Sequence, residues 1–338
     1  MRIALLAVDG LFDSGLSSLL DVLATANALR TDAPAGGSPF DVTVVSTQAE
    51  VRTGHGLRLA TTPLTDLADA PDVLVMPAVG FKAPAQVVDI VRDHAALAEV
   101  VALHEAGSAL AAACSGTFFL AEANLLDGLV ATTSWWLGPA FRSRYPAVRL
   151  DESRTLVRDG QVTTAGAAFA HIDLALSIVQ QESPALADLV ARYLVIGDRP
   201  SQAVFAVPSH LASNDPTVTA FEQWVRDHLA DSAQISGAAA AIGVSERTLQ
   251  RTTAAVLGMS PIDFVHEIRL DQATFLLRTT SQTVDAVAAA VGYQNTSTLR
   301  ALVRRRRGTT ISALRVGRPD WHTMASGQSS RSNQATSQ

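Results

Sequence analysis

Short, continuously apolar runs alternate with amphipathic segments along the first 194 residues. The apolar runs predict buried parallel strands at residues 2–8, 40–47, 73–76 and 109–113. The amphipathic segments predict helices at residues 16–29, 85–105, 117–123, 168–181 and 184–194. Asp159-Gly160, between residues 155–158 and 161–164, is typical of a hairpin turn. The alternation of strand and helix predicts a doubly wound, flavodoxin-like α/β domain.

The pattern changes between residues 235 and 315, where a loose repeat of about fifty residues indicates paired helical units. Ile242-Gly243-Val244-Ser245 recurs as Val291-Gly292-Tyr293-Gln294, and Gly258 recurs as Gly308. In each copy an Ala-rich apolar run predicts a short helix, the glycine allows a left-handed turn, and a polar-capped helix follows. The repeat predicts an all-α, double helix-turn-helix domain.

The second helix of each copy has an outer face suited to nucleic acid. In the first copy Ser245 caps the helix, Leu249 faces inward, and the outer positions are Glu246, Arg247, Gln250 and Arg251. Arg and Gln are the side chains that read guanine and adenine edges in a major groove. In the second copy the outer positions are Asn295, Thr296, Ser297, Thr298 and Arg300, followed by the run Arg304, Arg305, Arg306 and Arg307. This run suits phosphate contacts better than base readout. The alternative, a solvated helical face with an incidental arginine run, is less favoured because the unit is repeated.

Composition and charge agree with a soluble protein that has a separate nucleic-acid module. The 338 residues are 48% hydrophobic and 17% charged, with a net charge of −6. Residues 1–216 hold 13 Lys and Arg against 23 Asp and Glu, whereas residues 217–316 hold 11 against 8. The N-terminal apolar run ends at Asp9, too short for a signal peptide or a membrane span, and the single cysteine excludes an internal disulfide. We therefore expect a cytoplasmic protein with no membrane segment.

These shifts in composition define the expected domains. Residues 1–196 form the α/β domain, and residues 197–216, which contain three prolines, form a linker. Residues 217–316 form the helical domain, and residues 317–338, rich in Ser, Gln and Asn, are expected to be a disordered tail.

Residues 217–316 resemble the AraC/XylS-type DNA-binding domain. The matching motifs are Gly243-Val244-Ser245, Leu249-Gln250-Arg251 and Gly258-Met259-Ser260-Pro261. The resemblance implies that DNA contacts come from Arg247, Gln250 and Arg251 in the first recognition helix and from Thr296, Ser297 and Arg300 in the second. Three residues depart from the family pattern, namely Thr253 where Phe is usual, Ala301 where Arg is frequent, and Ile311 in place of a proline.

The single cysteine, Cys114, lies where a predicted strand turns into a helix. Such a turn lifts a side chain above the carboxyl ends of the strands, where helix amides lower a thiol's pKa and hold an oxyanion. The alternative is a cysteine that serves as a small buried hydrophobe.

Four segments follow one another after the predicted fourth strand, namely Cys114 to Gly116, Leu120 to Ala123, Leu125 to Gly128 and Ala131 to Thr133. With these segments in this order, residues 1–195 resemble the PfpI-type, glutamine-amidotransferase-like domain. Joined to an AraC-type module in this order, the chain resembles the GlxA family of transcriptional regulators. Enzymes of the wider superfamily combine the cysteine with a histidine and an acid. Here Ser134 takes the histidine position, and the acid slot falls on Gly15, with Asp13 the nearest carboxylate.

A ligand pocket is expected around the cysteine. Its candidate residues are Cys114, Ser115, Ser134, Trp135, Asp13, Gly80 and His171. His171 either enters the pocket as a base or packs near a helix start, which we favour. The Trp135-Trp136 pair either walls a site for a cationic or quaternary-amine ligand or serves packing and a subunit interface. Gly80, after Pro77-Ala78-Val79, occupies the loop that in the resembled domain supplies a backbone amide to the pocket.

These observations together predict a sequence-specific transcriptional regulator that senses a small nitrogen-containing metabolite without catalysis. The expected effector is an amino acid, an amine or a betaine, and no cofactor or metal is expected. Promoter DNA and a second copy of the chain are the expected partners, with RNA polymerase a further candidate, and the family resembled favours activation over repression. The alternatives are a cysteine-dependent hydrolase or amidase fused to a DNA-binding module, and a dimerisation scaffold without a ligand.

Overall fold

The computed structural model describes residues 1–34, 36–80, 83–197, 202, 212, 215–231 and 234–316. The chain divides into two compact units near residue 206. The predicted tail, residues 317–338, and most of the predicted linker, residues 197–216, lie outside the described residues. None of the described helices is both long and apolar enough to cross a bilayer.

The N-terminal unit is built on a seven-stranded sheet with the order β10-β11-β7-β6-β1-β2-β5. Its strands are β1 (Arg2–Leu6), β2 (Asp41–Ser46), β5 (Thr62–Pro63), β6 (Val73–Met76), β7 (Ala109–Ala113), β10 (Leu156–Asp159) and β11 (Val162–Ala165). Neighbouring strands are parallel except β10, which forms the predicted hairpin with β11. The central strands are buried on both faces, as the continuous apolar runs predicted.

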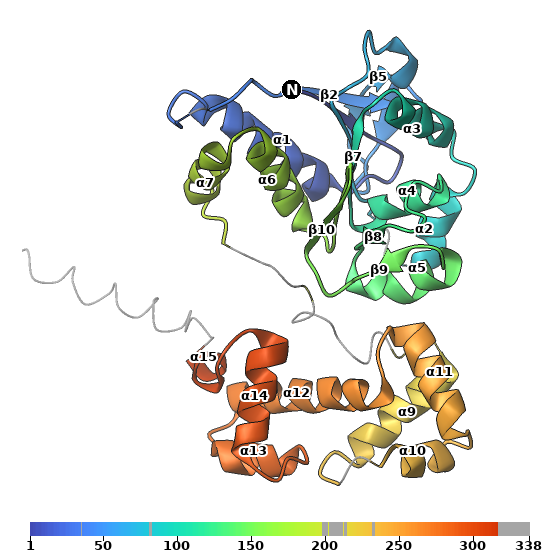
Figure 1. Cartoon of the computed structure of the whole chain (residues 1–338), viewed down its shortest axis with the longest axis vertical. Helices are drawn as coiled ribbons and strands as arrows, with labels where there is room; N and C mark the ends of the chain where they lie inside the picture. Colours follow the sequence, from blue (N-terminus) through green and yellow to red (C-terminus); the bar gives the residue numbers. More distant parts are fainter. Residues whose placement is uncertain are drawn as a thin grey trace, which may run out of the picture. The chain divides into compact units, whose positions relative to one another are not determined.

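Helices cover both faces of this sheet (Figure 1). One face is covered by α1 (Asp13–Leu29), α6 (Ala170–Glu182) and α7 (Pro184–Tyr193). The other is covered by α2 (Pro84–Val91), α3 (Ala96–Glu105), α4 (Thr117–Glu122) and α5 (Gly138–Arg144). Each face has its own hydrophobic core, so the doubly wound α/β prediction is confirmed.

Two features of the N-terminal unit differ from the sequence prediction. The single helix expected over residues 85–105 is two helices, because the chain breaks at Asp93, whose φ is +54°. Two small sheets were not predicted: β3 (Glu50–Arg52) with β4 (Arg58–Ala60), and β8 (Val130–Ala131) with β9 (Arg149–Leu150). Strands of two or three residues are too short to show a hydrophobic period.

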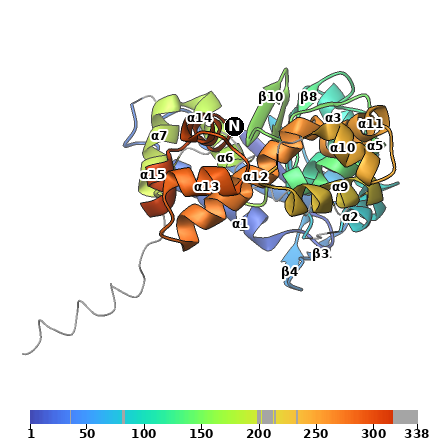
Figure 2. The same cartoon turned by 90° about the horizontal axis from the view of Figure 1, so that it is seen from below.

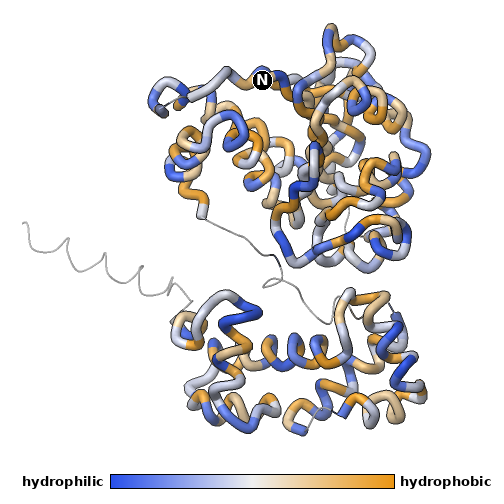
Figure 3. Tube along the Cα trace, in the orientation of Figure 1, coloured by the Kyte–Doolittle hydropathy of each residue, from blue (hydrophilic) through white to orange (hydrophobic). Residues whose placement is uncertain are grey.

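The C-terminal unit is entirely helical among its described residues. Its helices are α9 (Pro216–Asp227), α10 (Ile235–Ala241), α11 (Glu246–Leu257), α12 (Pro261–Thr279), α13 (Val284–Ala290), α14 (Thr296–Arg307) and α15 (Ile311–Val316). Within this unit α9 to α11 gather at one end of α12 and α13 to α15 at the other (Figures 1 and 2). Hydrophobic and hydrophilic positions alternate along α12 (Figure 3). Apolar positions are therefore available for packing against the helices at each of its two ends.

The repeat read from the sequence is present in the backbone. Gly243 and Gly292 have φ values of +75° and +77°, and Gly258 and Gly308 have +68° and +62°. All four lie in the left-handed region that favours glycine. Each pair ends corresponding helices, so the prediction of two helix-turn-helix units is confirmed.

Candidate functional site

The chain turns sharply between β7 and α4, and Cys114 stands on that turn. Its φ of +55° lies in the left-handed region that residues with a Cβ rarely adopt. A Cβ at Gly116 would lie 2.1 Å from the carbonyl oxygen of Met76. The turn is therefore pressed against the carboxyl end of β6, and the predicted strand-to-helix elbow is confirmed.

The Cys114 side chain is closed off from solvent, with only 5% of the residue exposed. Ser134 donates its hydroxyl hydrogen to Cys114 Sγ over 2.7 Å, and Thr133 Oγ1 donates to the Cys114 carbonyl oxygen over 2.7 Å. Ser134 Oγ in turn accepts the amide hydrogen of Ala167 at 3.0 Å. Burial raises the pKa of the Cys114 thiol. Burial outweighs the hydrogen bond from Ser134, which by itself favours the thiolate, so the thiol is protonated at neutral pH. Ser134 is not a base that could remove this proton.

His171 lies at the start of α6 and is fully buried. Its Nε2 accepts a hydrogen bond from the Ala78 amide at 3.0 Å, and its Nδ1 contacts the Ala168 carbonyl oxygen. These partners assign the hydrogen to Nδ1 of a neutral ring. Burial lowers the pKa of His171 to about 4. Both ring nitrogens are engaged, so the favoured interpretation, a histidine packed near a helix start, agrees with the structure.

Gly15 and His171 fit together across the site. A Cβ at Gly15 would lie 2.7 Å from Nε2 of His171, closer than side-chain atoms approach. The imidazole therefore occupies the space next to the expected acid slot, which only a glycine leaves open. Asp13, the nearest carboxylate, pairs instead with His55: its Oδ2 accepts from the His55 amide at 3.1 Å and lies 2.8 Å from His55 Nδ1.

The loop after β6 uses its own amides internally. The Gly80 amide, expected to face a ligand, donates to the Gly10 carbonyl oxygen at 2.7 Å. The Val79 amide donates to Ser115 Oγ at 2.9 Å. The Gly80 amide is therefore engaged within the chain, because this loop folds back onto the turn between β1 and α1, where Leu11 and Val79 form an antiparallel bridge. Both amides are therefore engaged by groups of the protein itself.

An apolar cavity of about 340 Å³ lies in the N-terminal unit. It is lined by Trp136, Thr155, residues 166–170, Asp173 and Gln202. None of the seven residues expected to form the ligand pocket is among its described lining residues. The adjacent Trp135 makes a perpendicular contact with Trp136, with ring centroids 5.6 Å apart, but Trp136 is the tryptophan that lines the cavity. The tryptophan pair was recognisable in the sequence, whereas Phe169 and Gln202 were not predicted as lining residues.

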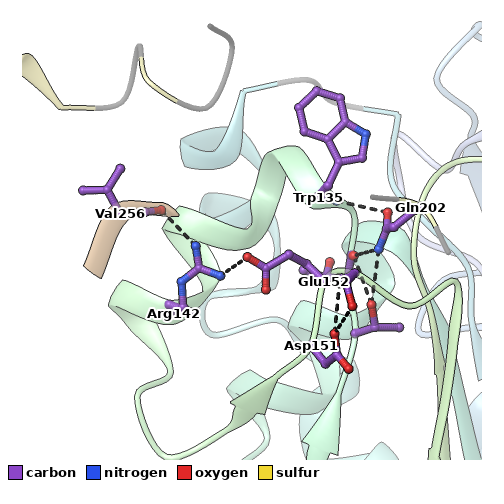
Figure 4. A network of polar contacts seen from close by, with 9 residues as sticks. Trp135, Arg142, Asp151, Glu152, Gln202 and Val256 are labelled. Atoms are coloured by element: carbon purple, nitrogen blue, oxygen red, sulfur yellow. Dashed lines mark hydrogen bonds and ion pairs between the residues drawn. The ribbon is translucent and has the colours of Figure 1, made fainter. Parts of the chain in front are cut away.

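Gln202 is the polar residue that organises this wall. It is 2% exposed, its Oε1 accepts from the Trp135 amide at 3.2 Å, and its Nε2 donates to the Thr133 carbonyl oxygen at 2.7 Å. Figure 4 shows the side chain reaching the Trp135 backbone. Ala167, which also lines the cavity, has a φ of +65°, so the cavity wall includes a strained residue.

In the first helix-turn-helix unit, the expected DNA-facing residues are on the surface. Ser245 Oγ accepts the Thr248 amide at 3.1 Å, and Leu249 is fully buried. Arg247, Gln250 and Arg251 are exposed. The predicted cap and the inward and outward faces of α11 are confirmed.

The second unit presents a smaller basic face than the sequence suggested. Asn295 Oδ1 caps α14 by accepting the Thr298 amide at 3.0 Å, and it also accepts the Ser297 hydroxyl at 2.7 Å. Thr296 is half-buried, whereas Arg300, Arg304 and Arg305 are exposed. Asn295 and Ser297 therefore have local hydrogen-bonding roles at the start of α14.

Two of the four consecutive arginines are structural. Arg306 donates from Nη1 to Glu267 Oε1 at 2.8 Å and from Nη2 to Asp263 Oδ1, and Arg307 Nη1 donates to Glu267 Oε2 at 2.7 Å. These ion pairs join α14 to α12. The expectation that the whole run contacts phosphates is wrong for Arg306 and Arg307, because the last turn of α14 directs both towards the acids of α12. We call Asp263, Glu267, Arg306 and Arg307 the α12–α14 clamp.

The fold and the surface residues define a two-part protein, a cysteine-elbow α/β domain joined to a double helix-turn-helix domain. The chain belongs to the DJ-1/PfpI family, whose model matches residues 1–181. A second model, described as a helix-turn-helix domain, matches residues 238–316.

Known relatives combine the same parts or share one of them. The HTH-type transcriptional regulator GbdR of Pseudomonas aeruginosa is 26% identical over 253 residues, 73% of this chain and 66% of that protein. The HTH-type transcriptional regulator GlxA of Rhizobium meliloti is 26% identical over 190 residues, 54% of this chain and 57% of that protein. Isonitrile hydratase of Pseudomonas putida is 32% identical over 138 residues, 39% of this chain and 54% of that enzyme. The chain thus matches less than two thirds of the length of each relative, and the predicted two-part resemblance is confirmed.

Proposed function

We propose that this chain is a DNA-binding transcriptional regulator whose N-terminal domain senses a small nitrogen-containing metabolite without catalysis. The observation that carries the proposal is the exposed face of α11, where Arg247, Gln250 and Arg251 stand on a capped helix preceded by a glycine turn. Such side chains at the start of a recognition helix read base edges in the major groove. The regulators GbdR and GlxA, which match this chain, support the same function.

The spacing of the two units suits one face of a DNA duplex. α12 has 19 residues, and at 1.5 Å per residue it is about 28 Å long. One turn of B-DNA is about 34 Å, so helices held at the two ends of α12 reach successive major-groove segments. In this proposal α11 supplies most of the base readout, and α14 supplies mainly phosphate contacts through Arg300, Arg304 and Arg305.

The absence of catalysis is proposed from the hydrogen bonds of the elbow. Cys114 has a raised pKa, its neighbour Ser134 is not a base, and both nitrogens of His171 are engaged. A nucleophilic cysteine needs the opposite arrangement, a lowered pKa and an adjacent base. The effector site is instead assigned to the cavity beside Trp136 and Phe169, whose rings favour an amine, an amino acid or a betaine.

The remaining parts of the proposal concern assembly and location. A homodimer would bind repeated sites, and a regulator of this kind acts in the cytoplasm at promoter DNA, with activation through RNA polymerase as the expected outcome.

The DNA-binding proposal is tested with the full chain on DNA from its own upstream region and on random DNA at two salt concentrations. Arg251→Ala is the test variant, and Arg192→Ala removes an exposed arginine from α7 as the matched control. We expect Arg251→Ala to weaken specific binding by about 1–3 kcal/mol and the control to behave as wild type. Equal losses by Arg251→Ala on specific and random DNA would contradict base readout. If the upstream DNA shows no preference, the same comparison is made on genome-wide fragments.

The sensor proposal is tested by thermal unfolding with amino acids, amines and betaines, because a ligand that binds only the folded state raises Tm. Trp136→Ala is expected to abolish any such shift. If no ligand raises Tm, the dimerisation scaffold is favoured instead.

The second candidate function is a cysteine-dependent hydrolase or amidase fused to a DNA-binding module. The strained φ of Cys114 at an elbow is the observation in its favour. Alkylation of the folded protein separates the two. A thiol that reacts rapidly near neutral pH would support the enzyme, and a thiol that reacts only on unfolding would support the non-catalytic sensor.

A further inference from the structure

A hollow of about 370 Å³ lies on the second helix-turn-helix unit. One wall is the outer face of α14, with Arg300 and Arg304, and the other wall is formed by Thr309 and Thr310, between α14 and α15, and by Ser312 in the first turn of α15. Two guanidinium groups therefore face three hydroxyl groups across one concave surface. Every polar side chain in this set donates hydrogen bonds, and none of the lining residues is acidic.

The shape of the hollow depends on small local features. Arg300 and Arg304 are four residues apart and lie on the same face of α14. Ala301, which stands where related helices often carry arginine, leaves the space beside them open. Gly308, with a φ of +62°, ends α14 and turns the chain back to form the second wall.

The second wall is held in place before any ligand arrives. Thr310 Oγ1 accepts the Ala313 amide at 3.2 Å, and Arg315 donates to the Gln282 carbonyl oxygen. Ile311 and Leu314 are 7% and 6% exposed and pack into the core of this unit. The walls are therefore preorganised, which reduces the entropic cost of binding.

The charges of the hollow are available to a ligand. Among the described residues, neither Arg300 nor Arg304 has an acidic partner, in contrast to Arg306 and Arg307 of the α12–α14 clamp. Arg305, the neighbour of Arg304, is exposed as well, but it does not line the hollow. The arginines of α14 therefore have three different environments. Arg300 and Arg304 line the hollow, Arg305 is exposed outside it, and Arg306 and Arg307 are paired with acids of α12.

We propose that this hollow binds one phosphate of the DNA backbone, with Arg300 and Arg304 on one side and the hydroxyls of Thr309, Thr310 and Ser312 on the other. Arginine with hydroxyl donors is a common set of phosphate ligands in DNA complexes. The contact fixes the register of the second unit on the duplex without reading sequence. The inference rests on the proposed DNA-binding function. It assigns Arg300 and Arg304 to one shared phosphate, whereas Arg305, which does not line the hollow, would contact a different phosphate.

The test uses the full chain and a site that the wild-type protein selects from a random-sequence duplex pool. Each phosphate of that site is replaced in turn by an uncharged methylphosphonate, and binding is measured for wild type, Arg304→Gln and Arg305→Gln. The last variant is the matched control, because it removes the same charge one residue along α14. Ser312→Ala tests the opposite wall without removing a charge.

We expect one phosphate at which methylphosphonate weakens wild-type binding about tenfold and Arg304→Gln binding hardly at all, a contact of about 1.4 kcal/mol. Arg305→Gln should remain as sensitive as wild type at that phosphate, and Ser312→Ala should lose a few-fold in affinity. The inference is overturned if no phosphate couples to Arg304, or if Arg304→Gln and Arg305→Gln give the same profile.

Failure of the proposed function gives a different result. If the wild-type protein selects no site, specific readout fails, and the hollow is then tested on a random duplex by salt dependence. There, Arg304→Gln should lower the slope of log affinity against log salt by about 1. An unchanged slope would overturn the inference.

Discussion

The α12–α14 clamp gives a quantitative prediction for the variant Glu267→Gln. Glu267 accepts from Arg306 and from Arg307, and the side-chain exposures are 15% for Glu267, 19% for Arg306 and 8% for Arg307. Removing one partner of a fully buried ion pair costs about 3–5 kcal/mol, whereas an exposed pair contributes less than about 1 kcal/mol. The clamp lies between these limits, and Arg306 keeps its contact with Asp263 in the variant. We therefore expect Glu267→Gln to cost about 2 kcal/mol of unfolding free energy.

The assay is urea unfolding of the full chain followed by far-ultraviolet circular dichroism, in which the helical unit contributes a large share of the signal. In a thermal melt of the same protein, a loss of about 2 kcal/mol from a unit of about 100 residues corresponds to a fall in Tm of about 10 °C. Asp271→Asn is the matched control, because it removes one charge from an exposed position on the same helix. A cost for Glu267→Gln that equals that of Asp271→Asn would refute the idea that the clamp holds α14 on α12. The same variant should lower DNA affinity, since α14 would no longer be held at a fixed distance from α11.

Two further predictions concern buried polar groups. Thr253 is fully buried and its hydroxyl has no hydrogen-bond partner among the described residues, so Thr253→Val should raise the unfolding free energy by about 1 kcal/mol. Thr274→Val, which removes a hydroxyl that donates to Leu270 O, should lower it in the same urea titration, and a loss in both variants would contradict the assignment. Since burial lowers the pKa of His171 from 6.5 to about 4, the unfolded chain binds the proton first as pH falls across that window. Stability should then fall by up to about 3 kcal/mol. Unfolding measured at several pH values should show this loss reduced in His171→Gln, and an unchanged pH dependence would show that other groups cause it.

Local signals explain why the helical unit could be predicted closely. The left-handed glycines Gly243 and Gly292 and the caps Ser245 and Asn295 act over a few residues, so their spacing in the sequence carries the geometry. The buried strands of the α/β unit were equally clear as apolar runs. The α12–α14 clamp could not be predicted from the sequence. The pairing of Glu267 with Arg306 depends on how α14 crosses α12, and the run of four arginines looks uniform in the sequence.

The elbow illustrates a limit of reading function from missing residues. The sequence identified Ser134 and Gly15 as departures from a catalytic set. The space of a missing side chain can, however, be occupied by a residue that is distant in the sequence. Here Ser134 donates to the cysteine, and the ring of His171 enters the space that Gly15 leaves. The complementarity of Gly15 and His171 is a steric relation between α1 and α6, which no local pattern encodes. An acid at position 15 would therefore have to displace His171, and with it the hydrogen bond to the Ala78 amide. The absence of an acid at position 15 and the burial of His171 are therefore sterically coupled, because one side chain can occupy that space only if the other does not.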